Sequence, residues 1–258
     1  MKQLAILVGA LWLGGAETAA AQPASSQPAA RPSGALQPKV APGLAGYTDE
    51  VLFGKVWPSP QLSQRDRSLV VISALIAMNR PAQLTGHLNR ALTNGVTPVQ
   101  ASGVLTHLAL YSGWPNAVSA LEVYDQVYSS RNIDFAALQA VSERLAPLAP
   151  SVRPSVPPGV AELAPKYASL TNDVVFGDAW RRSDLTRRDR ALVTIVALAA
   201  AGDDAMLEPY LRLAPQVGLP REDLAEALTH LAFYAGWPKA TTALSEVARV
   251  WPAQGGQP

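Results

Sequence analysis

An internal repeat constrains this 258-residue chain more than any other feature of its sequence. The repeated motifs, first copy against second, are Phe53-Gly54 with Phe176-Gly177, Arg65-Asp66-Arg67 with Arg188-Asp189-Arg190, Thr106-His107-Leu108-Ala109 with Thr229-His230-Leu231-Ala232, and Gly113-Trp114-Pro115 with Gly236-Trp237-Pro238. Every matched pair is separated by 123 positions (residue 53 against residue 176), so no insertion or deletion lies between the motifs. A constant offset of this kind indicates a duplicated structural unit. We therefore expect two tandem domains, at residues 42–130 and 165–251.

The segments outside the two copies differ from them in composition. Within the connecting residues 131–164 we expect a helix near Asp134 to Leu145, followed by a Pro-rich linker from Pro147 to Pro158. Residues 22–41 are rich in Ala, Pro, Ser and Gln, which predicts a disordered tether. Residues 252–258 are expected to form a short tail.

The N-terminal residues 1–21 have the pattern of a signal peptide. Lys2 supplies a positive charge, an apolar run extends from Leu4 to Leu13, and small residues at 19–21 suit a cleavage site. The alternative interpretation is an uncleaved membrane anchor, although the run is short for a bilayer span. We expect the mature protein to be periplasmic or secreted, with no membrane span after the signal is removed.

The residues of each copy predict helices. Ser63 stands three positions before Asp66, and Thr186 stands three before Asp189, which is a pattern that opens helices. The run from Leu69 to Met78 is apolar on every side, as in a helix buried on several faces. Further helices are expected over about 82–93, about 98–112 and from residue 115, and alternating strand patterns are absent. The fold class is therefore all-α.

Composition excludes several classes of function. The net charge is +1 with no block of like charge, which argues against a nucleic-acid partner. The absence of cysteine removes thiol catalysis and thiolate metal sites. The three histidines have no metal-ligand spacing, and no Gly-rich phosphate loop is present. We therefore expect neither a metal nor a nucleotide cofactor.

The first copy resembles the carboxymuconolactone decarboxylase family. The motifs that carry the resemblance are Leu62-Ser63, Arg65-Asp66-Arg67-Ser68-Leu69-Val70, His87 with Ala91, Asn94-Gly95-Val96-Thr97, His107, and Tyr111-Ser112-Gly113-Trp114-Pro115. The second copy follows the same order. The resemblance implies two tandem helical bundles of the AhpD-like type. Family members form trimers or hexamers of single domains, so the resemblance also implies a homo-oligomer, with a trimer of tandem chains as the first expectation.

The family includes a branch that reduces peroxides with a Cys-x-x-Cys pair. The corresponding stretches here are Arg80-Pro81-Ala82-Gln83 and Asp203-Asp204-Ala205-Met206. Neither stretch can form a disulfide, so thiol peroxidase activity is disfavoured.

His87 is the candidate catalytic residue. It lies on an apolar helix face, and imidazole titrates close enough to neutral pH to act as an acid or a base. The alternative is a hydrogen-bonded histidine in the core. The second copy has Tyr210 at this place, which suggests that this copy is a degenerate, structural half.

Other residues near His87 in the first copy are candidates for substrate binding. Arg65 or Arg67 could hold a carboxylate in a bidentate pair, whereas an internal ion pair with Asp66 is the alternative. His107 recurs as His230, which favours a shared structural role over catalysis. Tyr111 and Trp114 could wall a small pocket, or Trp114 could anchor a tight turn.

The leading hypothesis is therefore an exported, cofactor-independent lyase. It would act on a small carboxylated lactone or related acid, with His87 in proton transfer. The alternatives are a non-catalytic binding or scaffold protein on the same fold, and a lactone hydrolase. An enzyme is expected to place His87 and an arginine in one concave site, whereas a scaffold is expected to have His87 packed and hydrogen-bonded.

Overall fold

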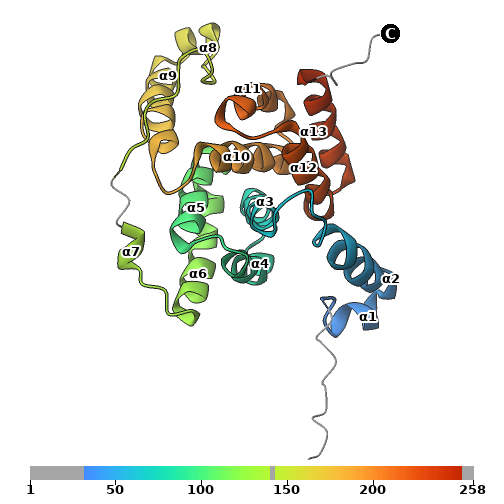
Figure 1. Cartoon of the computed structure of the whole chain (residues 1–258). Coiled ribbons are helices and arrows are strands. Elements are labelled where there is room, and N and C mark those ends of the chain that lie inside the picture. The colour runs from blue at the N-terminus through green and yellow to red at the C-terminus, as the bar shows by residue number, and fades with distance from the viewer. Residues whose placement is uncertain (1–31, 140–142, 252–258) are drawn as a thin grey trace, which may run out of the picture.

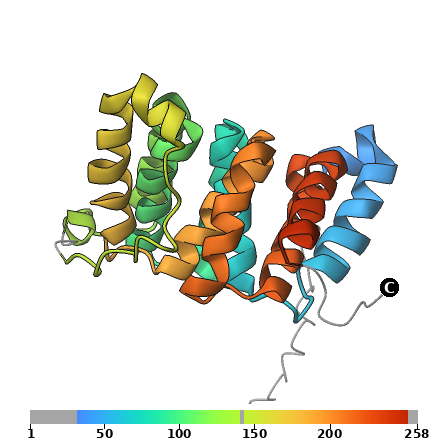
Figure 2. The same ribbon diagram turned by 90° about the horizontal axis from the view of Figure 1, so that it is seen from above.

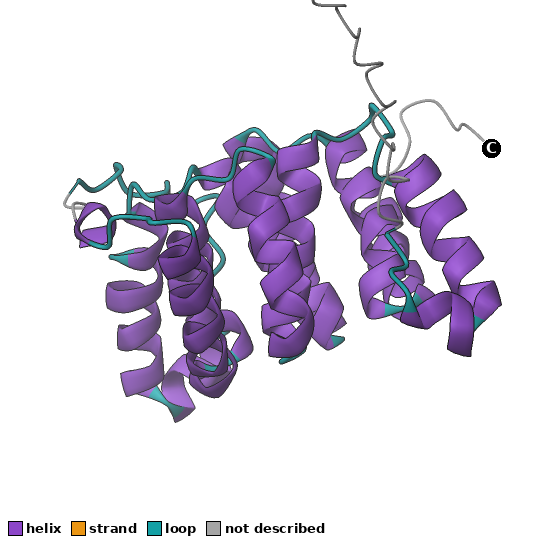
Figure 3. Ribbon diagram, turned by 90° about the horizontal axis from the view of Figure 1, so that it is seen from below, coloured by secondary structure: helices purple, strands orange, loops and turns teal. Residues whose placement is uncertain are grey.

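The computed structural model describes residues 32–139 and 143–251. The expected signal peptide, residues 22–31 of the expected tether and the tail at 252–258 lie outside these residues. The described chain is helical and contains no strand, only a single bridge between Arg144 and Arg182 (Figure 3). None of its helices is both long and apolar enough to cross a membrane. The expected all-α fold is confirmed.

The two copies contain matching series of helices. The first copy has α2 (Pro42–Gly46), the π-helix η1 (Tyr47–Val56), α3 (Gln64–Ala77), α4 (Pro81–Thr93), α5 (Pro98–Ser112) and α6 (Trp114–Ser130). The second has α9 (Pro165–Leu170), the π-helix η2 (Thr171–Phe176), α10 (Arg187–Ala201), α11 (Leu207–Leu213), α12 (Arg221–Ala235) and α13 (Trp237–Val250). Short 3-10 turns lie at η3 (Ala179–Arg181), η4 (Asp204–Met206) and η5 (Ala214–Val217). Outside the copies are α1 (Leu36–Val40), α7 (Ala136–Gln139) and α8 (Pro158–Leu163).

The central helix of each copy begins at the expected N-cap. The Ser63 hydroxyl accepts the backbone N–H of Asp66 at 3.0 Å, and the Thr186 hydroxyl accepts that of Asp189 at 3.0 Å. These bonds satisfy donors that the first helical turn leaves without a partner. The reciprocal half of a capping box is missing at both caps, because the two aspartates bind arginines instead.

Helices α3 and α10 pack against each other at the centre of the molecule (Figure 1). Every residue from Asp66 to Ala77 is buried, as is every residue from Asp189 to Ala200. Other helices cover both from several sides, as the all-round apolar pattern of these segments predicted. The two copies therefore share one continuous core.

The first helices of the two copies exchange places. Helices α1, α2 and η1 (blue) lie at the same end of the molecule as α13 (red), whereas α9 (dark yellow) lies at the same end as α5 and α6 (green), as Figures 1 and 2 show. Each end of the molecule is therefore built from both copies. This exchange brings residues from the two halves of the sequence into common sites.

Two expected segments differ from the structure. The helix expected near Asp134 to Leu145 is limited to α7 in the described residues, and the backbone N–H of Leu145 instead donates to the Arg181 carbonyl at 2.6 Å. The expected disordered tether includes the helix α1, and just before it the Ser33 hydroxyl donates to Asp49 at 2.8 Å.

Candidate active site

Two reciprocal ion pairs join the copies where α3 meets α10. Arg65 binds Asp189 at 2.7 Å, and Arg188 binds Asp66 at 2.9 Å. The hydrogen bond with Asp189, opposed by partial burial, raises the pKa of Arg65. Because each pair is the other shifted by 123 positions, the copies are related by an approximate two-fold axis. Every site in one half therefore has a counterpart in the other.

Arg67 is fully buried and is held by residues of both copies. Its Nη2 donates to Oε1 of Glu226 on α12 at 2.7 Å and to the Ser59 carbonyl at 3.0 Å. Its Nη1 lies 3.5 Å from Nδ1 of His230. A buried guanidinium needs such compensation because an unpaired buried charge is costly.

The counterpart of Arg67 is Arg190, whose carboxylate partner comes from a different element. Nη2 of Arg190 pairs with Asp184, which precedes α10, and donates to the Arg182 carbonyl at 2.6 Å. Nη1 lies 3.3 Å from Nδ1 of His107. Position 103 would match Glu226, but it holds glycine.

The two buried histidines, His107 and His230, differ in whether their second ring nitrogen, Nε2, has a hydrogen-bond partner. Nε2 of His107 lies 2.8 Å from the hydroxyl of Thr194. Nε2 of His230 is buried without a partner among the described residues, because the residue matching Thr194 is Val71. Burial and the nearby Arg67 lower the pKa of His230 to about 3, so its ring is neutral at pH 7.

A tryptophan–tyrosine pair closes the same region in each half. Nε1 of Trp57 donates to the Tyr234 hydroxyl at 3.1 Å, and Nε1 of Trp180 donates to the Tyr111 hydroxyl at 2.7 Å. Each tyrosine comes from the copy opposite to its tryptophan. Burial raises the pKa of Tyr234 to about 12, so its hydroxyl stays protonated at neutral pH.

His87 lines a cavity of about 350 Å³ at the junction of the two copies. The other lining residues are Leu75, Met78, Arg80, Gln83, Phe233 and Tyr234. The imidazole meets the Tyr234 ring edge to face, with centroids 5.2 Å apart, and makes no hydrogen bond within the described chain. Burial, with a smaller contribution from Arg90, lowers the pKa of His87 to about 4.

Two arginines around this cavity have no carboxylate partner among the described residues. Nη1 of Arg80 donates to the Met78 carbonyl at 2.9 Å, and the Arg90 guanidinium lies 4.8 Å from the centroid of the Phe53 ring. Carbonyl and ring contacts leave the positive charge of both side chains unneutralised. The cavity is therefore suited to an anionic ligand.

The counterpart cavity in the other half is larger and less polar. Its volume is about 630 Å³, and Tyr210 replaces His87, Met206 replaces Gln83, and Asp203 replaces Arg80. The Tyr210 hydroxyl donates to that of Tyr111 at 3.0 Å. This cavity therefore lacks both the imidazole and the cation that line the His87 cavity.

The structure separates the residues that the sequence grouped around His87. Arg67 is fully buried against His230, whereas His87 is only partly buried, and Arg65 binds Asp189 at the interface between the copies. Neither guanidinium is available to a substrate carboxylate while these pairs hold. His107 and Tyr111 belong to the opposite half, because the exchanged packing joins each to residues of the second copy.

Trp114 is 64% exposed and lies beside the apolar cavity rather than near His87. The residues that sequence reasoning missed are Arg80, Arg90, Glu226 and Tyr234. Arg80 could have been identified from the sequence, because it begins the stretch that corresponds to the Cys-x-x-Cys pair of the family's peroxidase branch. Tyr234 was recognisable only as the repeat counterpart of Tyr111, and Glu226 gave no signal; the sequence did not show that either would meet residues of the first copy.

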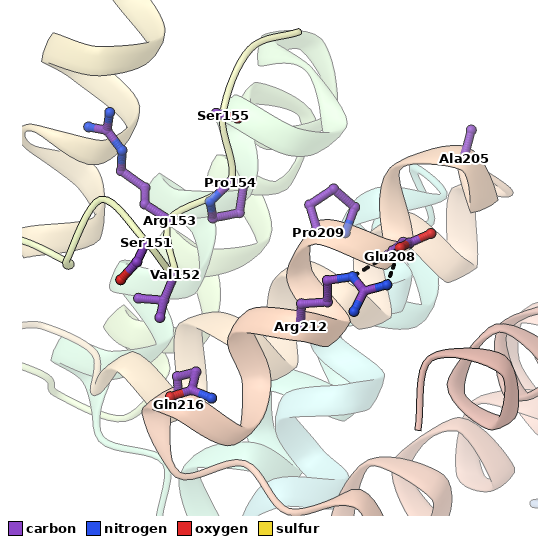
Figure 4. Close-up of a pocket in the computed structure, with 10 residues that line it drawn as sticks. All are labelled: Ser151, Val152, Arg153, Pro154, Ser155, Ala205, Glu208, Pro209, Arg212 and Gln216. Carbon is purple, nitrogen blue, oxygen red and sulfur yellow. Dashed lines mark hydrogen bonds and ion pairs between the residues drawn. The ribbon is translucent and has the colours of Figure 1, made fainter. Parts of the chain in front are cut away.

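A third hollow, of about 510 Å³, separates the linker from α11 (Figure 4). Glu208 and Arg212 on its α11 side pair with each other at 2.7 Å, and Arg153 points away from them toward Asn172. Glu208 and Arg212 thus neutralise each other, and Arg153 is directed out of the hollow. In the described part of the chain, no group of three or more His, Asp or Glu side chains could hold a metal ion.

Comparison with known proteins supplies the chemical context. The model of the Carboxymuconolactone decarboxylase family matches residues 42–126 and 165–249. The 4-carboxymuconolactone decarboxylase of Acinetobacter baylyi is 35% identical over 87 residues, which are 34% of this chain and 65% of that protein. The nitrosuccinic acid decarboxylase npaB of Metarhizium robertsii is 33% identical over 74 residues, 29% of this chain and 52% of that protein. The match therefore covers less than two thirds of either relative.

Proposed function

Because this chain belongs to the carboxymuconolactone decarboxylase family, we propose that it is a cofactor-independent carbon–carbon lyase that decarboxylates a small carboxylated lactone or a related acid. Both named relatives are decarboxylases, which supports the reaction class. The observation that carries the proposal is His87, an imidazole to which no described residue hydrogen-bonds, in a cavity that also contains Arg80.

Arg80 would bind a substrate carboxylate at the cavity. Among the described residues, its guanidinium hydrogen-bonds only to backbone carbonyls. A substrate carboxylate could therefore bind the guanidinium without breaking an ion pair. Tyr234 accepts the Trp57 N–H, and its own hydroxyl hydrogen has no acceptor among the described residues. That hydrogen is available to a lactone or carboxyl oxygen of the substrate.

His87 would supply the proton that the reaction consumes. Decarboxylation breaks the bond between carbon and the carboxylate, CO₂ leaves, and the electron pair stays on the substrate carbon, which then takes one proton. The free site holds His87 neutral, since its pKa is about 4. An anionic substrate beside the ring raises that pKa, so the site takes up the proton as the substrate binds.

The first test is the loss of γ-carboxymuconolactone absorbance with the purified protein. The matched variants are His87→Phe and Tyr210→Phe, which place the same side chain at the two equivalent positions. We expect the first to lose at least about a hundredfold in turnover and the second to keep it. Turnover that survives His87→Phe would remove His87 from the reaction. A folded protein without turnover would favour the binding-protein alternative.

Lactone hydrolysis is the second candidate, because a neutral imidazole without a partner could also activate water as a general base. The products separate the two reactions. Decarboxylation releases CO₂, whereas hydrolysis opens the ring and retains every carboxyl group.

We also propose that the protein is exported to the periplasm or secreted, and that it is a homo-oligomer, with a trimer as the first expectation. Exposed apolar residues on α1 and α6, namely Leu36, Val40, Val118 and Leu121, support association. N-terminal sequencing of the mature protein tests the export. Light scattering on the eluted protein measures the number of chains.

A further inference from the structure

The apolar cavity opposite the His87 cavity has no part in the proposed reaction, yet it is well formed. It lies between the end of α5, the helices α9 and η2, and α11, and its volume of about 630 Å³ is in the range of small-molecule sites. Among its lining residues, Leu110, Leu170, Val174, Leu198 and Met206 are apolar. No arginine, lysine or histidine lines it.

Among the buried donors at this cavity, one has no acceptor in the described residues. Trp180 contributes an N–H, and Tyr111 and Tyr210 contribute one O–H each, which makes three hydrogens. Two hydrogen bonds, one from Trp180 to Tyr111 and one between the two tyrosines, use two of these three hydrogens. Because the Tyr210 hydroxyl donates to that of Tyr111, the hydrogen that remains belongs to the Tyr111 hydroxyl, and no described residue accepts it. Burial raises the pKa of Tyr111 well above its usual value, so this hydrogen is present at neutral pH.

The charge at the cavity is the reverse of that at the His87 cavity. Asp203 occupies the position of Arg80 and has no ion-pair partner among the described residues. A carboxylate at this place disfavours an anion, since like charges repel. An uncharged ligand with an apolar body meets no such penalty.

We propose that this cavity is a second ligand site, which binds a small neutral aromatic or aliphatic molecule that carries a single hydrogen-bond acceptor such as a ketone, ester or lactone oxygen. The acceptor takes the spare tyrosine hydrogen, and the apolar body fills the space along η2 and α11. The site is distinct from the His87 cavity and is independent of the proposed reaction, because its ligand has no carboxylate to lose.

The methionines of the chain provide a test for which cavity a ligand enters. Of the three, Met206 lines the apolar cavity, Met78 lines the His87 cavity, and Met1 begins the chain. In the protein labelled with ¹³C at the methionine methyl groups, titration with acetophenone is expected to shift the Met206 signal to saturation and to leave Met78 in place. Two further probes, similar in shape to acetophenone, test which chemical groups the cavity recognises. Ethylbenzene lacks the acceptor and is expected to bind about fivefold more weakly, and benzoate is expected not to shift Met206.

A matched pair of substitutions tests the location. Val174→Trp fills the apolar cavity and is expected to weaken acetophenone binding at least about tenfold. Val51→Trp, made 123 positions earlier in the other copy, is expected to leave it within about twofold. If Val174→Trp fails to fold, the three-probe series still decides the question.

Three results would overturn the proposal: no saturable shift of Met206, equal shifts of both methionines, or benzoate binding at Met206 as tightly as acetophenone. A Met206 signal that moves with protein concentration and ignores acetophenone would also reject it, and would assign the surface to a contact between chains.

Discussion

The carboxylate of Asp184 lies in the space that a side chain at Gly103 would occupy. A Cβ atom built on Gly103 would lie 3.0 Å from Cγ of Asp184. In the other half, the position equivalent to Gly103 holds Glu226, which is the partner of Arg67. In this half, the carboxylate that neutralises the buried Arg190 therefore comes from Asp184, in the loop before α10, rather than from a helix. Gly103 leaves the space that this carboxylate occupies.

This close approach predicts the effect of a single methyl group. Gly103→Ala forces contacts of 3.0–3.2 Å with Asp184 and Leu185, so we expect it to lower the free energy of unfolding by about 1–3 kcal/mol. Gly86→Ala on α4 is the control, because nothing lies within 4 Å of its Cβ, and it is expected to stabilise by up to about 1 kcal/mol. Urea denaturation measures both. Equal effects of the two substitutions would contradict the packing described.

The partner of His107 gives a second prediction. Thr194→Val removes the hydroxyl 2.8 Å from Nε2 and leaves a buried ring nitrogen unsatisfied, so we expect a loss of about 1–3 kcal/mol in the free energy of unfolding. The reciprocal substitution Val71→Thr offers His230 the hydroxyl that it lacks and should cost much less, or should stabilise. A cost for Val71→Thr equal to that for Thr194→Val would mean that the equivalence of these positions does not extend to their hydrogen bonds.

Substrate binding at Arg80 gives a third prediction, which rests on the proposed function. Arg80→Ala removes a cation with no carboxylate partner at the cavity, so we expect KM to rise about tenfold or more while kcat changes less. Arg212→Ala, an exposed arginine paired with Glu208, is the control and is expected to leave both constants unchanged. Steady-state kinetics decide between them. If kcat falls and KM stays constant, Arg80 acts in the transition state rather than in binding.

The dependence of stability on pH gives a fourth prediction. The pKa values of His87 and His230 are lowered to about 4 and about 3 by burial, whereas an unfolded histidine titrates near 6.5. As pH falls below about 6.5, the unfolded state binds protons that the folded state does not, so the free energy of unfolding decreases. Their full contribution to stability is present above about pH 6.5.

Between pH 7.5 and pH 5 we expect each of these histidines to account for about 1–2 kcal/mol of lost stability. Urea denaturation at the two pH values measures the total. His87→Gln is expected to reduce the difference, because it removes one of the groups that protonate on unfolding. An unchanged difference in this variant would show that His87 titrates alike in both states.

The sequence predicted the helical architecture well, because the determinants of these helices are local. Ser63 and Thr186 cap their helices as the spacing indicated, and the all-round apolar runs became the buried α3 and α10. The helix expected up to Leu145 was overextended, because residue 145 bonds to the carbonyl of Arg181, a contact that no local pattern reveals.

The amino-acid sequence is enough to show that the chain contains two equivalent helical units with the same series of motifs, and that the second has Tyr210 where the first has His87. A repeat specifies the likeness of two units but contains no information on how their surfaces dock. Three relationships depend on the packing: Tyr234 rather than Tyr111 faces His87, Glu226 neutralises Arg67, and Arg80 is left as the cation for a ligand. These partners depend on the packing of α3 against α10 and α12, which burial of apolar surface from both copies sets across long separations in the sequence.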